Sequence, residues 1–366
     1  MPDVTHIPTA LWHDIINLAC VDGGLTGRSL ALASRFFYAQ SLCCRFHSLA
    51  FNSLQQLEGF LAFLRLQPVD YRPKIQHICL SLLDEPVKTS TVSLKAYSGM
   101  AREQQRAHDL KTQQERARWD GRFCVTSIAL LTLAARTLRT LCVVEDGLAP
   151  LPLTFPCELP QLRELSWKGK ILAFEPSALG LTGTFRFTAT FPVLERVHFI
   201  TTAVDGIVPM ILLTKIPTIT HFRISNLGYV DILLPDALAR ALGVKPMYPW
   251  LPDGPEDGNA DPQRSSISSL STPRPYLRQL IIHGTSSAPG GWCWHYNREW
   301  ARIHSQLEAL ARGPGLDGTH TLVLDRPWFR ALRWSHRMRD YWLDRIQGGR
   351  GCWVESEAQE VVSEGP

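Results

Sequence analysis

Leu162-Arg-Glu-Leu165-Ser-Trp167 shows the pattern on which the fold depends, because its form, L-x-x-L-x-L with Trp in the last place, recurs along the chain. Six further six-residue phrases of this form, with Ile, Val, Phe or once Thr in place of Leu, begin at residues 75, 138, 194, 219, 277 and 319. Apolar and polar residues alternate over the last four positions of each phrase, which is the period of a strand with one buried face. The sequence therefore predicts seven short, half-buried strands.

The spacing of the phrases indicates a repeat. The phrases that begin at 138 and 162 lie 24 residues apart, and those at 194 and 219 lie 25 apart. Leucine-rich repeats recur every ~20–29 residues. A single strand with its return segment cannot bury an apolar face, whereas stacked neighbours can. Proline, which stops the preceding segment and favours an extended entry, stands two residues before five of the phrases: Pro73, Pro160, Pro192, Pro217 and Pro275.

The phrases place a degenerate leucine-rich-repeat-like domain over residues 71–325, with its strands in one roughly parallel sheet. Residues 125–137 are predicted to form a helix behind the strand at 138. Two polar insertions interrupt the domain: residues 98–122, an exposed helix or a disordered excursion, and residues 245–275, a solvated loop rich in Pro, Gly and Ser. Leucines at helical spacing predict a bridging helix within residues 51–70.

The end of the chain, residues 326–366, is predicted to be a helix followed by an acidic tail. One face of the helix collects Trp334, Met338, Tyr341 and Trp342, and the opposite face carries Arg and Asp together. We expect the helix to cap the last repeat, with a partner site on its basic residues as the alternative.

Residues 1–50 form a separate helical pattern. Thr9 is a plausible N-cap, and three helices are predicted from apolar residues at helical spacing. The first carries Leu11, Trp12, Ile15, Ile16 and Ala19, the second Leu30, Ala31, Ser34 and Phe37, and the third Leu42, Phe46 and Leu49.

These residues resemble an F-box, whose pattern is an L-P pair, a short helix, a loop and a second helix that reads roughly L-x-x-V-S-R-x-F. The matching residues are Ile7-Pro8, Leu11-Trp12, Ile15-Ile16, Leu30-Ala31-Leu32, Ser34-Arg35 and Phe36-Phe37. The layout, with the box first and degenerate leucine-rich-like repeats after it, is similar to that of F-box-like proteins numerous in fungal genomes. The fold class expected is α/β: a small three-helix F-box-like module, an irregular leucine-rich-repeat-like α/β solenoid and a C-terminal capping helix.

The resemblance also implies a function. F-box proteins dock on the small adaptor subunit of SCF-type cullin ubiquitin ligases, and their repeat domain presents a protein substrate for protein ubiquitination. The adaptor-binding residues implied are Ile7, Pro8, Leu11, Trp12, Ile15, Ile16, Leu32, Ser34 and Phe36. The alternative is a protein-binding repeat scaffold that joins no ligase. The sequence leaves the substrate unidentified.

Composition narrows the classes of protein to which the chain could belong. The 366 residues are 45% hydrophobic and 20% charged, which is ordinary globular composition. The net charge of +4 is too small an excess of basic residues to indicate nucleic-acid binding. The longest strongly apolar run, residues 123–135, is too short for the ~20 residues that cross a bilayer, and the N-terminus lacks the pattern of a signal peptide. Nine cysteines without a C-x-x-C pair indicate reduced, mostly buried thiols, so we expect a cytoplasmic or nuclear protein without a membrane partner.

No motif supports an enzyme, a cofactor or a metal. Residues 313–318 match G-x-G-x-x-G, but they follow a predicted helix and precede a predicted strand, which is the reverse of the order that dinucleotide binding requires. Residues 23–29 lack the lysine and the strand-to-helix turn of a phosphate loop. Two small Cys/His groups, Cys43-Cys44 with His47 and Cys293 with His295, lack the second pair of a zinc site. The rival hypotheses left open are an enzyme with an unrecognised site and a nucleic-acid binder.

Overall fold

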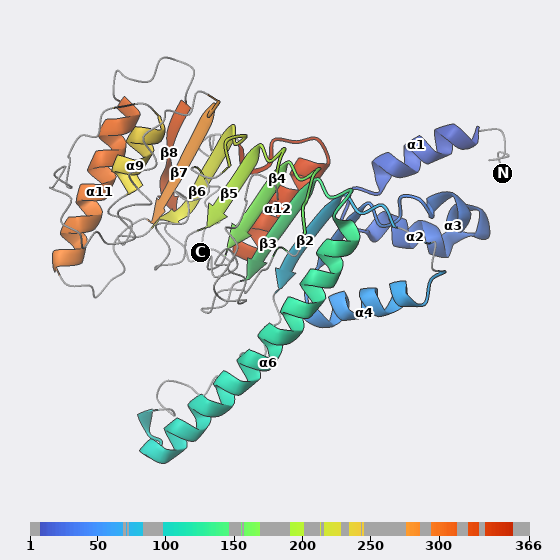
Figure 1. Ribbon diagram of the computed structural model, residues 1–366, viewed down its shortest axis with the longest axis horizontal. Coiled ribbons are helices and arrows are strands. Elements are labelled where there is room, and N and C mark those ends of the chain that lie inside the picture. The colour runs from blue at the N-terminus through green and yellow to red at the C-terminus, as the bar shows by residue number, and fades with distance from the viewer. Residues whose placement is uncertain are drawn as a thin grey trace, which may run out of the picture. The chain divides into compact units, whose positions relative to one another are not determined.

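A computed structural model provides the structure of the chain, which divides into two compact units (Figure 1). The first unit comprises residues 1–161, 169–185 and 333–339, and the second comprises 162–168, 186–332 and 340–366. The structure describes residues 8–68, 71, 73–82, 98–145, 155, 157–168, 191–200, 213, 216–227, 234–242, 244, 276–285, 294–312, 321–328 and 334–353.

The first unit begins with helices and continues into a sheet. Its elements are α1 (Thr9–Ala19), α2 (Leu25–Ala33), α3 (Arg35–Ser41), β1 (Ser48–Phe51), α4 (Leu54–Arg65), β2 (His77–Leu82), α6 (Arg102–Ala134) and β3 (Thr140–Glu145). The helix α4 is the predicted bridging helix, and the Ser53 side chain caps it by accepting a hydrogen bond from the Gln56 backbone N–H.

The second unit is built mainly from strands. Its elements are β4 (Glu164–Lys168), β5 (Arg196–Ile200), β6 (His221–Leu227), α9 (Leu234–Ala241), β7 (Gln279–Thr285), α11 (Trp294–Arg312) and β8 (Thr321–Trp328). A final helix, α12 (Trp334–Ile346), begins in the first unit and ends in the second, where the short 3-10 turn Gly351–Trp353 follows it.

The predicted strands are confirmed, and they are parallel. Within each unit the strands follow chain order, β1-β2-β3 in the first and β4 to β8 in the second, and every pairing described is parallel. The third position of one phrase lies opposite the third position of the next: His77 faces Thr140, and Glu164 faces Arg196. The phrases thus stack in register, and the register shifts only beyond them, between Ser225 and Leu227 and between His283 and Thr285.

A shared backbone contact precedes five of the described strands: β2, β3, β5, β6 and β7. The carbonyl oxygen at the second position of one phrase accepts hydrogen bonds from the second and third backbone N–H groups of the next. Arg163 O, for example, accepts from Glu195 N at 3.0 Å and Arg196 N at 2.9 Å. Glu195 O and Thr220 O repeat this pattern in the second unit, and Gln76 O does so in the first. Because these amides precede the ladder, their pairing fixes where each strand begins.

The prediction that the strands are half-buried is wrong. Alternate positions are buried on both faces: in β5, His198 is as inaccessible as its neighbours Val197 and Phe199. Strands of parallel sheets are commonly covered on both sides. The polar residues of the phrases therefore meet other parts of the chain instead of solvent.

Two predictions for the N-terminal helices are also wrong. Residues 42–49 are not a third helix, because the chain forms β1 there and pairs Ser48 with His77. Phe46-His-Ser-Leu49-Ala-Phe51 has the spacing of the repeated phrase, which explains this strand. The predicted second helix is broken at Ser34, whose extended backbone ends α2 and whose hydroxyl caps α3 by accepting from Phe37 N.

The predicted polar insertion at 98–122 and the predicted helix at 125–137 belong largely to one long helix, α6. Its C-terminal half is buried through Phe123, Leu130 and Leu131, whereas its N-terminal half extends beyond the sheet of its own unit (Figure 1). The predicted loop 245–275 lies outside the described residues. Among the described helices, none has the combination of length and apolar sequence that a membrane span needs.

The C-terminal segment, by which we mean residues 340–353, covers one face of the second ladder, which is our name for the parallel strands β4 to β8. The prediction that it caps the last repeat concerns β8, whose side chains lie outside the described residues. The contacts described for residues 340–353 lie on β4, β6 and β7. The Arg345 guanidinium pairs with Glu164 at 2.9 Å, the Trp353 indole N–H donates to the same carboxylate at 3.1 Å, and Arg223 donates to the Cys352 carbonyl at 2.7 Å. Polar side chains at the third and fifth phrase positions need such partners once buried.

Candidate protein-docking surface

The first three helices form a module with its own small core. Ile16, Cys20 and Cys44 make a buried cluster, against which Leu30 and Phe37 pack. Beside it, the Trp12 ring meets Phe37 and Phe36 edge-on, with centroids 5.3 and 6.0 Å away. Such aromatic pairs add to the burial of area. The core uses one side of α1.

Close backbone packing fixes the loop between α1 and α2. The Asp22 carboxylate accepts hydrogen bonds from Gly24 N and Thr26 N at the start of α2, and the Ser48 hydroxyl donates to the Cys20 carbonyl at 2.7 Å. At Gly27 an added Cβ would lie 2.5 Å from the Arg45 carbonyl oxygen, so only glycine fits. The glycine-rich sequence here therefore serves helix capping and packing.

Arg45 joins this module to the bridging helix. Its guanidinium is buried and lies 4.8–5.9 Å from the ring centroids of four aromatic residues: Tyr38, Phe46, Phe63 and Tyr71. Burial alone would lower the pKa of Arg45, but hydrogen bonds with the hydroxyls of Tyr38 and Tyr71 raise it above the usual value. This cation–π cage connects α3 and its following turn to α4.

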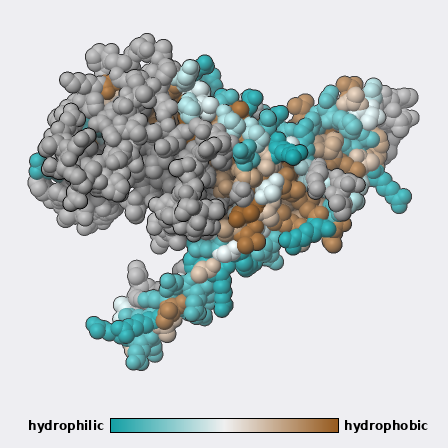
Figure 2. Space-filling model, viewed as in Figure 1, coloured by the Kyte–Doolittle hydropathy of each residue, from teal (hydrophilic) through white to brown (hydrophobic). Residues whose placement is uncertain are grey.

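The opposite side of α1 is apolar and uncovered. Leu11, Ile15 and Leu18, which we call the α1 stripe, are 52%, 49% and 77% exposed. Their spacing of four and three residues places them on one face of the helix. Figure 2 shows apolar residues over the helices of the module. Large apolar groups that gather on a surface commonly mark a site of protein interaction.

The nine predicted docking residues divide into three groups. Four are apolar and exposed: Leu11, Ile15, Leu32 and Phe36. Ile16, Trp12 and Ser34 instead serve the module internally, as core, aromatic contact and helix cap. Pro8 is exposed at the N-cap of α1, and Ile7 lies outside the described residues.

Sequence reasoning missed Leu18 and Leu25, which are also exposed. Leu18 follows Leu11 by seven residues, so the helical period that found the other members of the α1 stripe could have found it.

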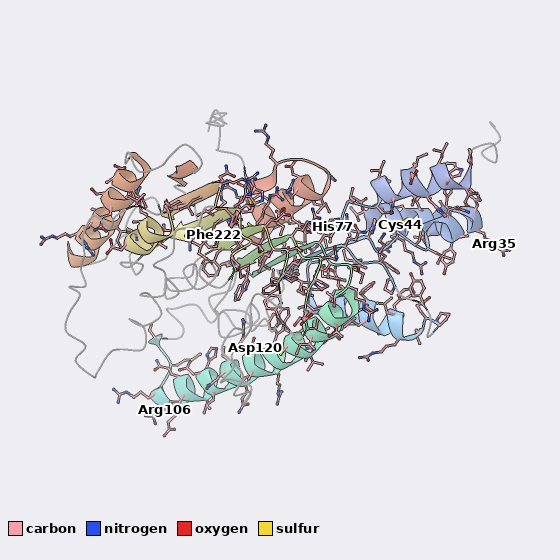
Figure 3. All side chains as sticks on the ribbon, turned by 45° about the horizontal axis from the view of Figure 1, so that its top comes forward. Arg35, Cys44, His77, Arg106, Asp120 and Phe222 are labelled. Carbon is pink, nitrogen blue, oxygen red and sulfur yellow. The ribbon has the colours of Figure 1, made fainter. Side chains whose placement is uncertain are left out.

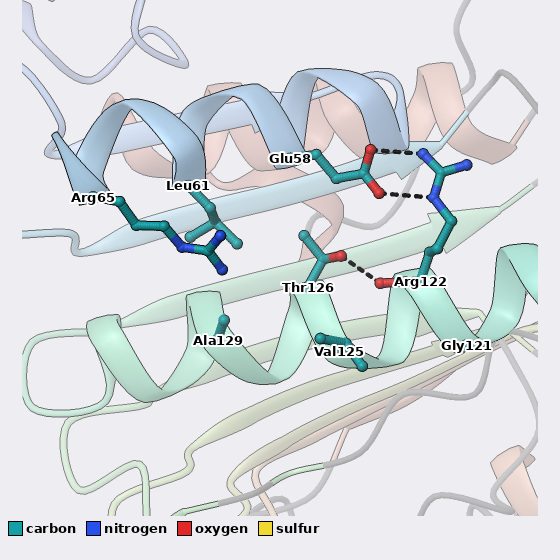
Figure 4. Close-up of a pocket in the computed structure, with 8 residues that line it drawn as sticks. All are labelled: Glu58, Leu61, Arg65, Gly121, Arg122, Val125, Thr126 and Ala129. Carbon is teal, nitrogen blue, oxygen red and sulfur yellow. Dashed lines mark hydrogen bonds and ion pairs between the residues drawn. The ribbon is translucent and has the colours of Figure 1, made fainter.

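A second surface feature of the first unit is a groove between α4 and α6 (Figure 4). It has a volume of about 410 Å³, and its apolar lining includes Leu61, Val125 and Ala129. At one end the Arg122 guanidinium donates to both Glu58 carboxylate oxygens, at 2.9 and 2.6 Å, and Arg65 lies at the other. The charged residues of its lining are Glu58, Arg65 and Arg122, of which Glu58 and Arg122 form an ion pair with each other. In the part of the chain that the structure describes, no group of three or more His, Cys, Asp or Glu side chains is arranged to hold a metal ion.

Comparison with known proteins adds no relative: no family model, no curated protein and no solved structure matches the chain.

Proposed function

We propose that the protein is an F-box-type substrate receptor, which acts in the cytoplasm or nucleus and recruits a protein target to an SCF-type cullin ubiquitin ligase. The observation that carries the proposal is the α1 stripe. It is exposed although the module has already closed a core on the other side of the same helix. A partner that covered Leu11, Ile15 and Leu18 would remove a contiguous apolar area from water.

The energetics of this stripe favour docking to another protein. Fully burying a leucine or isoleucine contributes about 1.5–3 kcal/mol relative to leaving it exposed. Three such residues at the centre of an interface would supply a hydrophobic anchor of the kind that dominates protein association. Pro8 and Phe36 are also exposed. Both belong to the F-box-like sequence pattern, and they would extend the contact.

We propose that the repeated phrases form a degenerate leucine-rich-repeat-like solenoid that holds the target. The register that the phrases keep and the carbonyl oxygen shared before five of the strands support a repeat of one structural unit. The polar face of β4, β6 and β7 is occupied by the C-terminal segment. A target would therefore contact side chains other than the third and fifth phrase positions of these strands.

The test is a pull-down of purified adaptor subunit by the full chain. We expect wild-type protein to retain the adaptor and the double variant Leu11→Asp/Ile15→Asp to lose it, because two carboxylates cannot be buried in an apolar contact. Pro8→Ala/Leu11→Asp probes the start of the same helix. The matched control is Leu66→Asp, since Leu66 is 84% exposed just beyond the end of α4 and outside the stripe.

The outcomes separate this function from its alternative. Retention by wild type and Leu66→Asp, with loss by the stripe variants, supports adaptor binding. No retention by wild type, or equal retention by all variants, overturns the ligase proposal. A protein-binding scaffold that joins no ligase would then be the better function for the same exposed surface.

A further inference from the structure

Three cysteines meet at the base of the N-terminal module. Cys20 ends α1 and Cys44 lies in the turn after α3, and both side chains belong to the buried cluster with Ile16. Cys43, the neighbour of Cys44, is exposed (Figure 3 labels Cys44). Two buried thiols from separate elements therefore lie beside one thiol that solvent can reach.

The three thiols interact with each other. The Cys43 and Cys44 thiols each donate to a backbone carbonyl three residues earlier, those of Gln40 and Ser41, at 3.8 Å. Hydrogen bonding with Cys20, together with burial, raises the pKa of Cys44. The hydrogen bond from Cys44 lowers the pKa of Cys20 although burial opposes this, whereas burial raises the pKa of Cys43. Because the thiolate is the species that attacks a disulfide, the lowered pKa favours Cys20 as the attacking thiol within the cluster.

The backbone around the cluster is held on both sides. Ser48 donates its hydroxyl proton to the Cys20 carbonyl, and Cys44 N and Arg45 N both donate to the Ser41 carbonyl, at 3.0 and 2.7 Å. The two buried cysteines are therefore fixed by strand β1 and by the turn after α3. A bond between them would join the end of α1 to that turn.

We propose that Cys20 and Cys44 are a redox modification site that low-molecular-weight disulfides oxidise, with Cys43 as the entry thiol. The Cys43 thiolate attacks one sulfur of the small disulfide, forms a mixed disulfide and releases one small thiol. The Cys20 thiolate then attacks the Cys43 sulfur, which forms a Cys20–Cys43 bond and releases the second small thiol. The Cys44 thiolate attacks the Cys20 sulfur in turn, which gives the Cys20–Cys44 bond and frees the Cys43 thiol. In total, two protein thiols and one small disulfide give one protein disulfide and two small thiols.

Oxidation would act on the module that carries the α1 stripe. A Cys20–Cys44 bond closes a loop that contains α2 and α3 and ties it to the end of α1, so it limits the movement of α1 against α3. Any effect on adaptor binding rests on the proposed function. The disulfide itself does not. Failure to find the disulfide would therefore overturn this inference alone, and failure to bind the adaptor would overturn the proposed function alone.

The experiment treats the folded full chain with glutathione disulfide, blocks remaining thiols by alkylation, digests with trypsin and identifies linked peptides by mass spectrometry. Trypsin releases Cys20 in residues 1–28, and Cys43 with Cys44 in residues 36–45. We expect these two peptides to be joined in wild type and separated again by a thiol reductant. We also expect oxidation to raise the thermal midpoint by a few degrees.

Variants assign the bond and the route. Cys20→Ala should abolish the joined peptides, and Cys44→Ala should leave only a Cys20–Cys43 bond, which fragmentation of the joined peptides distinguishes from Cys20–Cys44. Cys43→Ser should still give the Cys20–Cys44 bond, but at least about tenfold more slowly because the entry thiol is missing. Cys79→Ala is the matched control, since Cys79 is equally buried and lies outside the cluster, and it should behave as wild type.

Either of two results in wild type overturns the proposal. One is glutathione that remains on Cys43 with no joined peptides, and the other is a bond between Cys43 and Cys44 within one peptide. Both are read from wild-type protein, so neither depends on whether a variant folds.

Discussion

The N-terminal module and the ladder of the second unit use side chains in opposite ways. The module leaves three large apolar residues of α1 in solvent, although apolar residues are the ones that folding normally buries. The ladder buries polar residues, among them Glu164, His198 and Arg223, on a sheet face that the sequence pattern assigned to solvent. The exposed apolar surface could be covered only by another molecule, whereas the buried polar face is covered by other residues of the same chain.

The largest effect should come from the core of the ladder. Phe222 is fully buried on the apolar face of β6, so Phe222→Ala should lower the free energy of unfolding by about 3–5 kcal/mol. Leu32→Ala, in the module, should change it by no more than about 0.5 kcal/mol, because Leu32 is exposed. Chemical denaturation of both variants measures the difference. Similar losses would mean that Leu32 is covered in the free protein.

The buried polar face gives the next effect. Glu164→Gln should cost about 2 kcal/mol, because the carboxylate that accepts from both Arg345 and Trp353 becomes a neutral amide with one acceptor oxygen. Glu195→Gln is the control: Glu195 lies 3.6 Å from Arg196 in a partly exposed pair, which should contribute about 0–1 kcal/mol. Equal, small losses in urea denaturation would show that the C-terminal segment does not hold this face.

Two glycines test the packing of the module against that of an open helix. Gly27→Ala should destabilise by about 1–3 kcal/mol, because the added methyl group meets the Arg45 backbone. Gly59→Ala, in the interior of α4 with nothing near its Cβ position, should stabilise by about 0.5–1 kcal/mol. Thermal unfolding reports both signs. A stabilising Gly27→Ala would contradict the close approach of α2 to residue 45.

The smallest effect concerns how stability depends on pH through His77 in strand β2 of the first unit. Burial, with the nearby His47 and Arg139, lowers the pKa of His77 to about 4. In the unfolded chain His77 takes up a proton near pH 6.5. Between these values the unfolded state binds more protons, so stability is full above pH 6.5 and falls as the pH drops towards 4. His77→Gln should remove on the order of 1 kcal/mol of the loss between pH 7 and 5. An unchanged pH dependence in denaturation experiments would contradict this assignment.

The positions of the strands could be predicted closely because each phrase carries apolar residues at fixed places and an alternating pattern. In most cases a proline two residues earlier also marks where the phrase begins. Strand β1 was missed because Phe46 and Leu49 also fit a helix with Leu42 and no proline marks the phrase. The covered polar face was beyond local reasoning, since Glu164 and Arg345 are 181 residues apart.

The candidate docking surface was predicted in part. The apolar period located the helix and most of the exposed residues, but Ile15 and Ile16 look alike in the sequence. Their separation into one exposed and one buried side chain depends on where α3 packs, which tertiary contacts decide.

Hydrogen–deuterium exchange of the full chain, with and without purified adaptor subunit, tests the central contrast most directly. The account predicts new protection in the amides of residues 9–19 and around Phe36, where the exposed apolar surface would be covered. It predicts no change in β4 to β7, whose polar face the C-terminal segment already holds. Protection in those strands alone, or none anywhere with adaptor in excess, would contradict it.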